Sequence, residues 1–239
     1  MAKKAIIIGA SSGIGAALAS ILSNHGYELG LAARRTSMLE ELCASLPGPA
    51  QIATIDVTQT SDTTSSLEQL IQKMGDVELF ILSAGSGSVN KNLDLQPELD
   101  TIAVNVSGFA TMANSAARHL QQRGSGTLVG LSSIAAIRGH GDAPAYGASK
   151  AFASNYLQGL RQKFARLGLP VTVLDIQPGF VDTDMAKSDK LFWVAPPRKA
   201  AMQIYRAIKK KRSHAYISRR WRLIAWVLKI LPDWLYHKL

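Results

Sequence analysis

A glycine-rich turn between a short apolar run and a helical pattern constrains the fold of this chain more than any other feature. The run at residues 5–8 is followed by Gly9-Ala-Ser-Ser-Gly13-Ile-Gly15, and apolar residues then recur at helical spacing as far as Asn24. Glycines at such a turn allow a tight reversal and a close approach of a pyrophosphate to the backbone. Free N–H groups at the start of the helix favour the anion. We therefore predict a dinucleotide site formed by Gly9, Ser11, Ser12, Gly13, Ile14 and Gly15.

Short apolar runs alternate with longer helical segments along the rest of the chain. Seven runs are expected as strands, beginning at residues 5, 29, 51, 77, 126, 171 and 215, and one long helix is expected over residues 96–122. Strands and helices of these lengths form right-handed βαβ units. We predict a Rossmann-type, doubly wound α/β domain over residues 1–218, with a parallel sheet of about seven strands covered by helices on both faces. A basic helical extension follows over residues 219–239.

Composition and charge narrow the class of protein further. Apolar residues make up 47% of the 239, which is enough for a core, and the single cysteine, Cys43, cannot form an intramolecular disulfide. No apolar stretch approaches the ~20 residues that span a bilayer, and the N-terminal run is too short for a signal peptide. We expect a cytoplasmic protein. The five histidines show no metal-ligand spacing, so no metal site is expected.

The end of the second expected strand indicates which nucleotide binds. Sheets specific for NAD carry an acidic residue there, about 20 residues past the glycines. This chain has Arg34 and Arg35 and no acid. Two guanidinium groups grip a 2′-phosphate well, although they are also common as solvated surface charges. The pattern favours NADP(H) over NAD(H).

Two further motifs supply groups for acid–base chemistry. Ser133 follows the fifth expected strand, and Tyr146-Gly-Ala-Ser-Lys150 lies in a helical segment. The i, i+4 spacing places Tyr146 and Lys150 on one helix face. A tyrosine has an ordinary pKa of about 10, and a nearby ammonium is expected to lower that pKa and permit proton exchange. Ser133 can donate a hydrogen bond to a substrate oxygen that gains negative charge.

With these motifs in this order, residues 3 to about 218 resemble the short-chain dehydrogenase/reductase family, of the compact single-domain type. The resemblance implies a catalytic triad of Ser133, Tyr146 and Lys150, with Asn105 as a fourth member that holds a water in a proton relay. Lys150 would also contact the nicotinamide ribose. The resemblance further implies that Asp56 and Val57 contact the adenine, and that the segment 178–183 holds the nicotinamide through Pro178, Gly179, Val181 and Thr183. The remaining cofactor contacts implied are Ala84, Gly85, Asn105 and Tyr146. The chain departs from the family pattern at Ile8, where threonine is usual, and at Ser83, where asparagine is usual.

The reaction implied is hydride transfer between a nicotinamide and a carbonyl or carbinol carbon, as in a carbonyl reductase or alcohol dehydrogenase. The alternatives are a protein that keeps the nucleotide fold without turnover, and an epimerase or dehydratase, which usually has a longer chain. The family implies a homodimer or homotetramer. An apolar lid is expected after Gly179, formed by Met185, Leu191, Phe192, Trp193 and Val194. Such a lid suits a lipophilic substrate, with a lipid-linked compound as one candidate, although lids are often apolar simply to exclude water.

The positive charge of the chain is concentrated near its C-terminus. Residues 1–186 hold 13 basic and 15 acidic residues, a net of −2, whereas residues 187–239 hold 14 and 2, a net of +12. The extension over residues 219–239 also contains Trp221, Trp226 and Trp234. Aromatic and basic residues around a short apolar helix suit peripheral contact with an anionic membrane, at the inner face. Contact with a partner subunit or with the chain's own body is the alternative, and nucleic acid is not expected because no recognition motif accompanies the charge.

Overall fold

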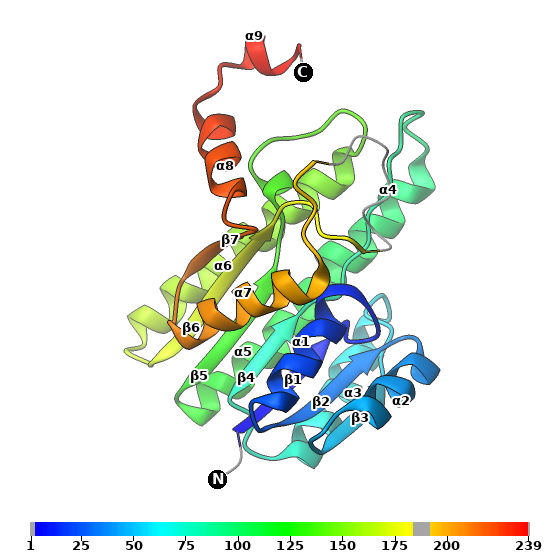
Figure 1. Ribbon diagram of the computed structural model, residues 1–239, viewed down its shortest axis with the longest axis vertical. Coiled ribbons are helices and arrows are strands. Elements are labelled where there is room, and N and C mark those ends of the chain that lie inside the picture. The colour runs from blue at the N-terminus through cyan, green and yellow to red at the C-terminus, as the bar shows by residue number, and fades with distance from the viewer. Residues whose placement is uncertain (1–2, 184–191, 239) are drawn as a thin grey trace.

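The computed structural model describes residues 3–183 and 192–238, and the strands within them form one parallel sheet (Figure 1). The strands are β1 (Lys3–Ile8), β2 (Tyr27–Ala33), β3 (Ala50–Thr54), β4 (Leu79–Leu82), β5 (Gly126–Leu131), β6 (Val171–Pro178) and β7 (His214–Ile217). Their order is β3-β2-β1-β4-β5-β6-β7, and every neighbouring pair is parallel. The predicted doubly wound α/β fold is confirmed.

Helices pack on both faces of this sheet. One layer holds α1 (Gly13–Asn24), α2 (Thr36–Ser45) and α7 (Pro197–Lys209), and the other holds α3 (Thr60–Met74), α5 (Phe109–Arg123) and α6 (Pro144–Arg166). In β1, Ala5 and Ile7 join the first core, whereas Ile6 and Ile8 join the second. Successive side chains of a strand point to opposite faces, so a strand covered on both faces is apolar at every position. This explains the unbroken apolar run before the glycine turn.

The strand order places the ligand crevice. The chain moves outward from β1 to β2 and β3, and then returns to add β4 on the opposite side of β1. The loops that follow β1 and β4 therefore leave the sheet in opposite directions. In open α/β sheets, ligands bind at the carboxyl ends of the strands where this reversal occurs.

The helix predicted over residues 96–122 is interrupted. In the structure α4 (Leu95–Ile102) passes into a π-helical turn, η1 (Ala103–Gly108), before α5 begins. Such turns are rare and occur mostly as single-turn bulges. Here the turn contains Asn105, whose side chain bonds to Ser86 in the loop after β4. The spacing of apolar residues does not reveal this π-helical turn, because the chain remains helical through it.

Two short helices complete the chain after β7. They are α8 (Trp221–Ile230) and α9 (Asp233–Tyr236), and Pro232 lies between them. Figure 1 shows both helices extending beyond the carboxyl ends of the strands. Over residues 3–183 and 192–238, no helix has both the length and the apolar character needed to cross a membrane.

Candidate active site

The turn between β1 and α1 has no room for side chains at two of its glycines. Gly9 has a φ of +89°, and a Cβ atom on it would lie 2.3 Å from the backbone nitrogen of Ala84. A Cβ atom on Gly15 would lie 2.1 Å from the carbonyl oxygen of Gly9. The backbone at the start of α1 is therefore bare, which lets a phosphate approach its N–H groups. These residues fit the pyrophosphate of a dinucleotide.

Arg35 lies directly over this turn. Its Nη2 atom donates hydrogen bonds to the hydroxyls of Ser11, at 3.1 Å, and Ser12, at 2.7 Å. Arg34 is exposed beside it, and both follow the carboxyl end of β2. The structure thus brings one of the two predicted arginines into contact with the glycine turn. A guanidinium at this position can bind a phosphate on the adenosine ribose.

The loop after β3 carries the two residues assigned to the adenine. The Oδ1 atom of Asp56 accepts hydrogen bonds from the N–H of Thr58, at 3.0 Å, and from its hydroxyl, at 2.8 Å. Val57 packs on Gly108 of η1, where a Cβ atom would lie 2.7 Å from the Val57 carbonyl oxygen. Both residues are thus held at the carboxyl end of the sheet.

The two departures from the family pattern, Ile8 and Ser83, meet in the structure. The N–H groups of Ser83 and Ala84 both donate to the carbonyl oxygen of Ile8, at 2.8 and 2.9 Å. These are backbone bonds, so they do not require the threonine and asparagine side chains that are usual at these positions. The backbone contact between β1 and the loop that carries Ala84 and Gly85 is therefore retained.

Asn105 links the loop after β4 to α6. Its Oδ1 atom accepts from the N–H of Ser86 at 2.8 Å, and its Nδ2 atom donates to the Ser86 carbonyl at 2.6 Å and to the Ser149 hydroxyl at 3.0 Å. The hydroxyl of Ser149 donates in turn to the Tyr146 carbonyl at 2.8 Å. Asn105 therefore fixes the turn of α6 that carries Tyr146 and Lys150.

Tyr146 lies between Ser133 and a glycine that the sequence did not single out. A Cβ atom on Gly87 would lie 2.5 Å from Cδ2 of the tyrosine, so the ring packs directly on the Gly87 backbone. Burial raises the pKa of Tyr146, and a hydrogen bond with Ser133 acts in the opposite direction. The Ser86-Gly87-Ser88 sequence was a signal for a close backbone approach in this loop.

The electrostatic role predicted for Lys150 is not what this geometry produces. Its Nζ atom lies 5.7 Å from the centre of the Tyr146 ring and donates to the Leu131 carbonyl at 3.2 Å. Burial lowers the pKa of Lys150 to about 8, although Asp175 acts to raise it. The pKa of Tyr146 is raised rather than lowered, because the loss of solvation around the phenol is the larger effect. The hydrogen bond that the structure shows for the ammonium goes to the backbone carbonyl of Leu131.

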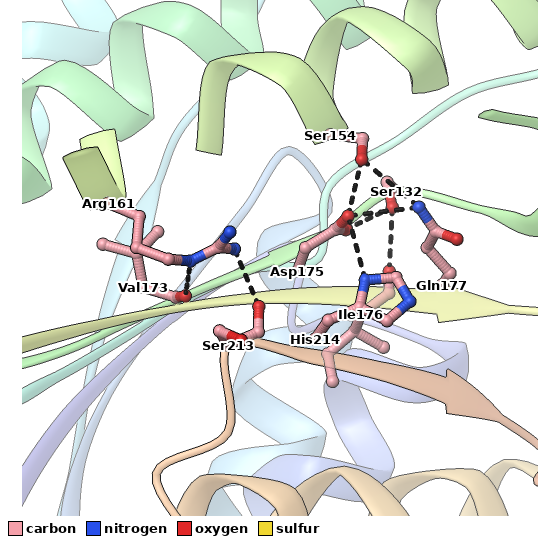
Figure 2. Close-up of polar contacts among 9 residues, drawn as sticks. All are labelled: Ser132, Ser154, Arg161, Val173, Asp175, Ile176, Gln177, Ser213 and His214. Atoms are coloured by element: carbon pink, nitrogen blue, oxygen red, sulfur yellow. Dashed lines mark hydrogen bonds and ion pairs between the residues drawn. The ribbon is translucent and has the colours of Figure 1, made fainter. Parts of the chain in front are cut away.

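A buried carboxylate behind these groups was not predicted. Asp175 of β6 accepts hydrogen bonds from Ser132, from Ser154 at 2.6 Å and from Gln177 at 3.1 Å, and His214 Nδ1 lies 3.5 Å from it (Figure 2). Burial raises the pKa of Asp175, but the hydrogen bonds outweigh burial and leave that pKa below its ordinary value. The network therefore holds a negative charge close to Lys150 and joins β5, β6, β7 and α6.

The segment after β6 closes over the glycine turn. The Thr183 Cγ2 atom would lie 3.0 Å from a Cβ atom on Gly13. Val181 is buried and pairs with Ala195, and Thr183 donates to the Val181 carbonyl at 3.3 Å. The segment 178–183 thus lies against the glycine turn at the start of α1. Of the predicted lid, Met185 and Leu191 lie outside the described residues, whereas Phe192, Trp193 and Val194 are exposed.

The C-terminal extension packs back on two parts of this site. Trp221 is only 3% exposed, and a Cβ atom on Gly179 would lie 2.1 Å from its indole ring. Its ring centre lies 5.1 Å from those of Phe180 and Phe192. Contact of the extension with the chain's own body was one of the alternatives predicted from the sequence. The structure shows this contact.

Arg138, in the loop between Ser133 and Tyr146, forms the second attachment. Its guanidinium donates to the carbonyls of Leu228, at 3.0 Å, and Leu231, and pairs with Asp233. The Tyr236 hydroxyl donates to the Gly139 carbonyl at 2.6 Å. The final carbonyls of a helix lack partners within it, and Arg138 satisfies that of Leu228 in α8 and also binds the carbonyl of Leu231, which follows the helix.

Together the fold and the site define a dinucleotide-binding oxidoreductase, in which a serine, a tyrosine and a lysine meet at the carboxyl end of the sheet. The sequence model of the short chain dehydrogenases matches residues 3–191. The chain belongs to this family and is an NAD(P)-dependent short-chain oxidoreductase. The match ends before α7, so it does not include the extension.

Curated relatives agree with this membership, and solved structures share the fold. An uncharacterized oxidoreductase of Staphylococcus epidermidis is 34% identical over 187 residues, which are 77% of this chain and 80% of that protein. One of Myxococcus xanthus is 30% identical over 97% of this chain and 93% of its own length. The structure of ElxO with NADP bound has a TM-score of 0.82 at 18% identity and covers 93% of this chain and 100% of that one. A short-chain type dehydrogenase/reductase from Mycobacterium ulcerans has a TM-score of 0.83 at 20% identity, with 99% and 98% covered.

Proposed function

We propose that the protein is an NADPH-dependent carbonyl reductase or alcohol dehydrogenase. The observation that carries this proposal is the meeting of Ser133, Tyr146 and Lys150, with Asn105 bonded to Ser86 in the loop after β4. When bound, the nicotinamide supplies or accepts the hydride at the reacting carbon.

Each of the four side chains has a task that its contacts support. The Ser133 hydroxyl donates a hydrogen bond to the substrate oxygen, where negative charge develops during reduction. The Tyr146 hydroxyl delivers the proton to that oxygen, and removes it in the reverse direction. Lys150 is protonated at neutral pH because its pKa is about 8, so it can return a proton towards the tyrosine. Asn105 holds the backbone of α6 and of the loop at Ser86, and a water beside it completes the relay.

The preference for NADP(H) over NAD(H) rests on Arg35. Its guanidinium already contacts two hydroxyls of the glycine turn, and the adjacent Arg34 adds a second positive charge. A doubly charged 2′-phosphate would find both groups at the end of β2. The similarity of the fold to ElxO, whose structures carry NADP and NADPH, supports the same choice.

A lipophilic substrate is supported by an aromatic cluster next to the segment Pro178–Thr183. The cluster is formed by Phe180, Phe192, Trp193 and Trp221, and in five of its six pairs the ring centres lie 5.1 to 6.4 Å apart. Phe192 and Trp193 are about half exposed, so they offer an apolar surface to a ligand. We place the reaction in the cytoplasm at the inner face of the membrane, in a homodimer or homotetramer, with a lipid-linked compound as a candidate substrate.

The proposed mechanism is tested by removing the phenol hydroxyl of Tyr146. Tyr146→Phe should lower carbonyl-dependent NADPH oxidation by about 10²-fold or more, the range for losing a general acid, while the affinity for NADPH changes little. Tyr156→Phe is the matched control, because Tyr156 lies on the same helix and packs on Phe109 and Phe152. Both variants and the parent are assayed against aliphatic and aromatic aldehydes and ketones. Equal turnover by Tyr146→Phe would contradict the mechanism. Tight NADPH binding without oxidation by any carbonyl would favour a nucleotide-binding protein that lacks turnover.

A further inference from the structure

Helix α8 presents apolar residues on two opposite faces. The inward face holds Trp221 and Ala225, which are 3% and 1% exposed. The outward face holds residues at i, i+3, i+4 and i+7, a spacing that forms one continuous stripe on a helix. Their exposed fractions are 65% for Leu223, 66% for Trp226, 47% for Val227 and 61% for Ile230. In Figure 1 the helix stands beyond the sheet, with α9 further out.

The short helix α9 also carries exposed apolar residues. Trp234 is 65% exposed and Leu235 is 37% exposed. Soluble proteins rarely leave a large contiguous apolar patch open to water, and such patches usually mark a site of interaction. The outward residues of α8 and Trp234 together form what we call the outer stripe: Leu223, Trp226, Val227, Ile230 and Trp234.

Basic residues flank the outer stripe. Arg219, Arg220 and Arg222 are exposed at the start of α8, and Lys229 and Lys238 are exposed further along. The acidic residue of this part of the chain, Asp233, is already paired with Arg138. A second copy of the chain seated on the same stripe would bring these positive charges against their own equivalents, which is unfavourable. An anionic partner is favoured instead.

We propose that the outer stripe is a docking surface for the head-group region of an anionic lipid bilayer. Tryptophan and basic side chains around a short amphipathic helix are the combination that binds there. Each basic residue near such a surface is expected to raise the affinity by roughly fivefold. At 1.5 Å per residue, α8 is about 15 Å long and therefore lies along the interface rather than across it.

Docking would also bring the substrate site to the bilayer. The inward face of the same helix packs on Gly179 and Phe180, in the segment assigned to the nicotinamide. Arg138 binds the end of α8 from the loop that leads to Tyr146. The bilayer is thus one helix thickness away from the site, so a lipophilic substrate can pass from one to the other; this part of the inference rests on the proposed function.

The experiment is co-sedimentation of the full chain with lipid vesicles. The parent protein should sediment with vesicles of phosphatidylcholine containing one-third phosphatidylglycerol, remain in the supernatant with pure phosphatidylcholine, and be released by high salt. The double substitution Trp226→Ser and Ile230→Ser should reduce binding by at least tenfold without changing the circular dichroism spectrum. The control is Leu95→Ser with Leu99→Ser on α4, which removes comparably exposed apolar residues and should leave binding unchanged.

Two results would overturn the proposal. The first is a parent protein that stays in the supernatant with both vesicle types at low salt, or a stripe variant that binds as the parent does. The second is a parent that is a dimer by light scattering and becomes monomeric with the stripe variant, without binding vesicles, since the stripe would then be a subunit contact. NADPH oxidation is measured separately without lipid, so loss of the proposed activity and loss of docking are distinguishable.

Discussion

The substitution Lys150→Met should make the protein more stable at neutral pH while it removes a group on which the proposed reaction depends. Lys150 is only 6% exposed, and burial lowers its pKa from 10.5 to about 8, with Asp175 acting in the opposite direction. Methionine is unbranched, flexible and uncharged, so it can occupy the same space. The variant therefore folds without taking a charge out of water.

The size of the effect follows from the pKa of Lys150. A difference of 2.5 units at 1.36 kcal/mol each means that folding with the ammonium protonated costs about 3 kcal/mol. The variant loses the hydrogen bond to the Leu131 carbonyl, which costs about 1 kcal/mol. The net gain at neutral pH is about 2 kcal/mol. Between about pH 8 and 10.5 the unfolded chain binds the proton and the folded chain does not, so the parent becomes more stable as pH rises and the variant loses its advantage.

Urea unfolding at about pH 7 and about pH 9.5 measures this difference. The variant should be more stable than the parent by about 2 kcal/mol at the lower pH and nearly equal to it at the higher one. Lys163→Met serves as the control for the loss of a lysine from the same helix, because Lys163 is exposed rather than buried. The reasoning is wrong if the parent is the more stable protein at neutral pH, or if the gain is the same at both pH values.

Two further substitutions test other parts of the site. Arg35→Ala should weaken NADPH binding by about 10- to 100-fold, the value of a charge-assisted phosphate contact, and leave NADH binding almost unchanged in a titration; an equal loss for both nucleotides would contradict the role of Arg35. Trp221→Ala should release α8 from Gly179 at a cost of about 3–5 kcal/mol, so that trypsin cleaves within residues 219–222 well before the sheet unfolds, whereas cleavage at the parent rate would show that the indole does not hold the helix.

The alternation of strands and helices was predictable because it depends on local spacing. Strands of a sheet covered on both faces are mostly apolar, and helices show a period of about 3.6 residues. Both patterns can therefore be recognised from a short stretch of sequence. The turn η1 was not predictable in this way. It depends on bonds between Asn105 and Ser86, which lie 19 residues apart and meet only in the folded protein.

The sequence predicted that Tyr146 and Lys150 lie close together, but not the direction in which the pKa of Tyr146 is shifted. The spacing of Tyr146 and Lys150 places them on one face of α6, as the structure shows. The direction of a pKa shift depends on how much solvent each group loses, and this is a property of the packed fold. Burial therefore raises the pKa of Tyr146, and Asp175, which contacts the site from another strand, opposes the effect of burial on Lys150.

The extension shows most clearly what a one-dimensional pattern omits. Trp221 and Trp226 are five residues apart, about 140° around a helix, so they must occupy different faces. Their identical side chains do not indicate which face is buried. Two contacts determine which face of α8 is buried. Gly179 has no side chain and therefore leaves space for the indole of Trp221. Arg138 binds carbonyls at the other end of α8. Because the same glycine lies in the segment assigned to the nicotinamide, the extension and that segment form a single packing unit, and any force that moves α8 must also act on the site.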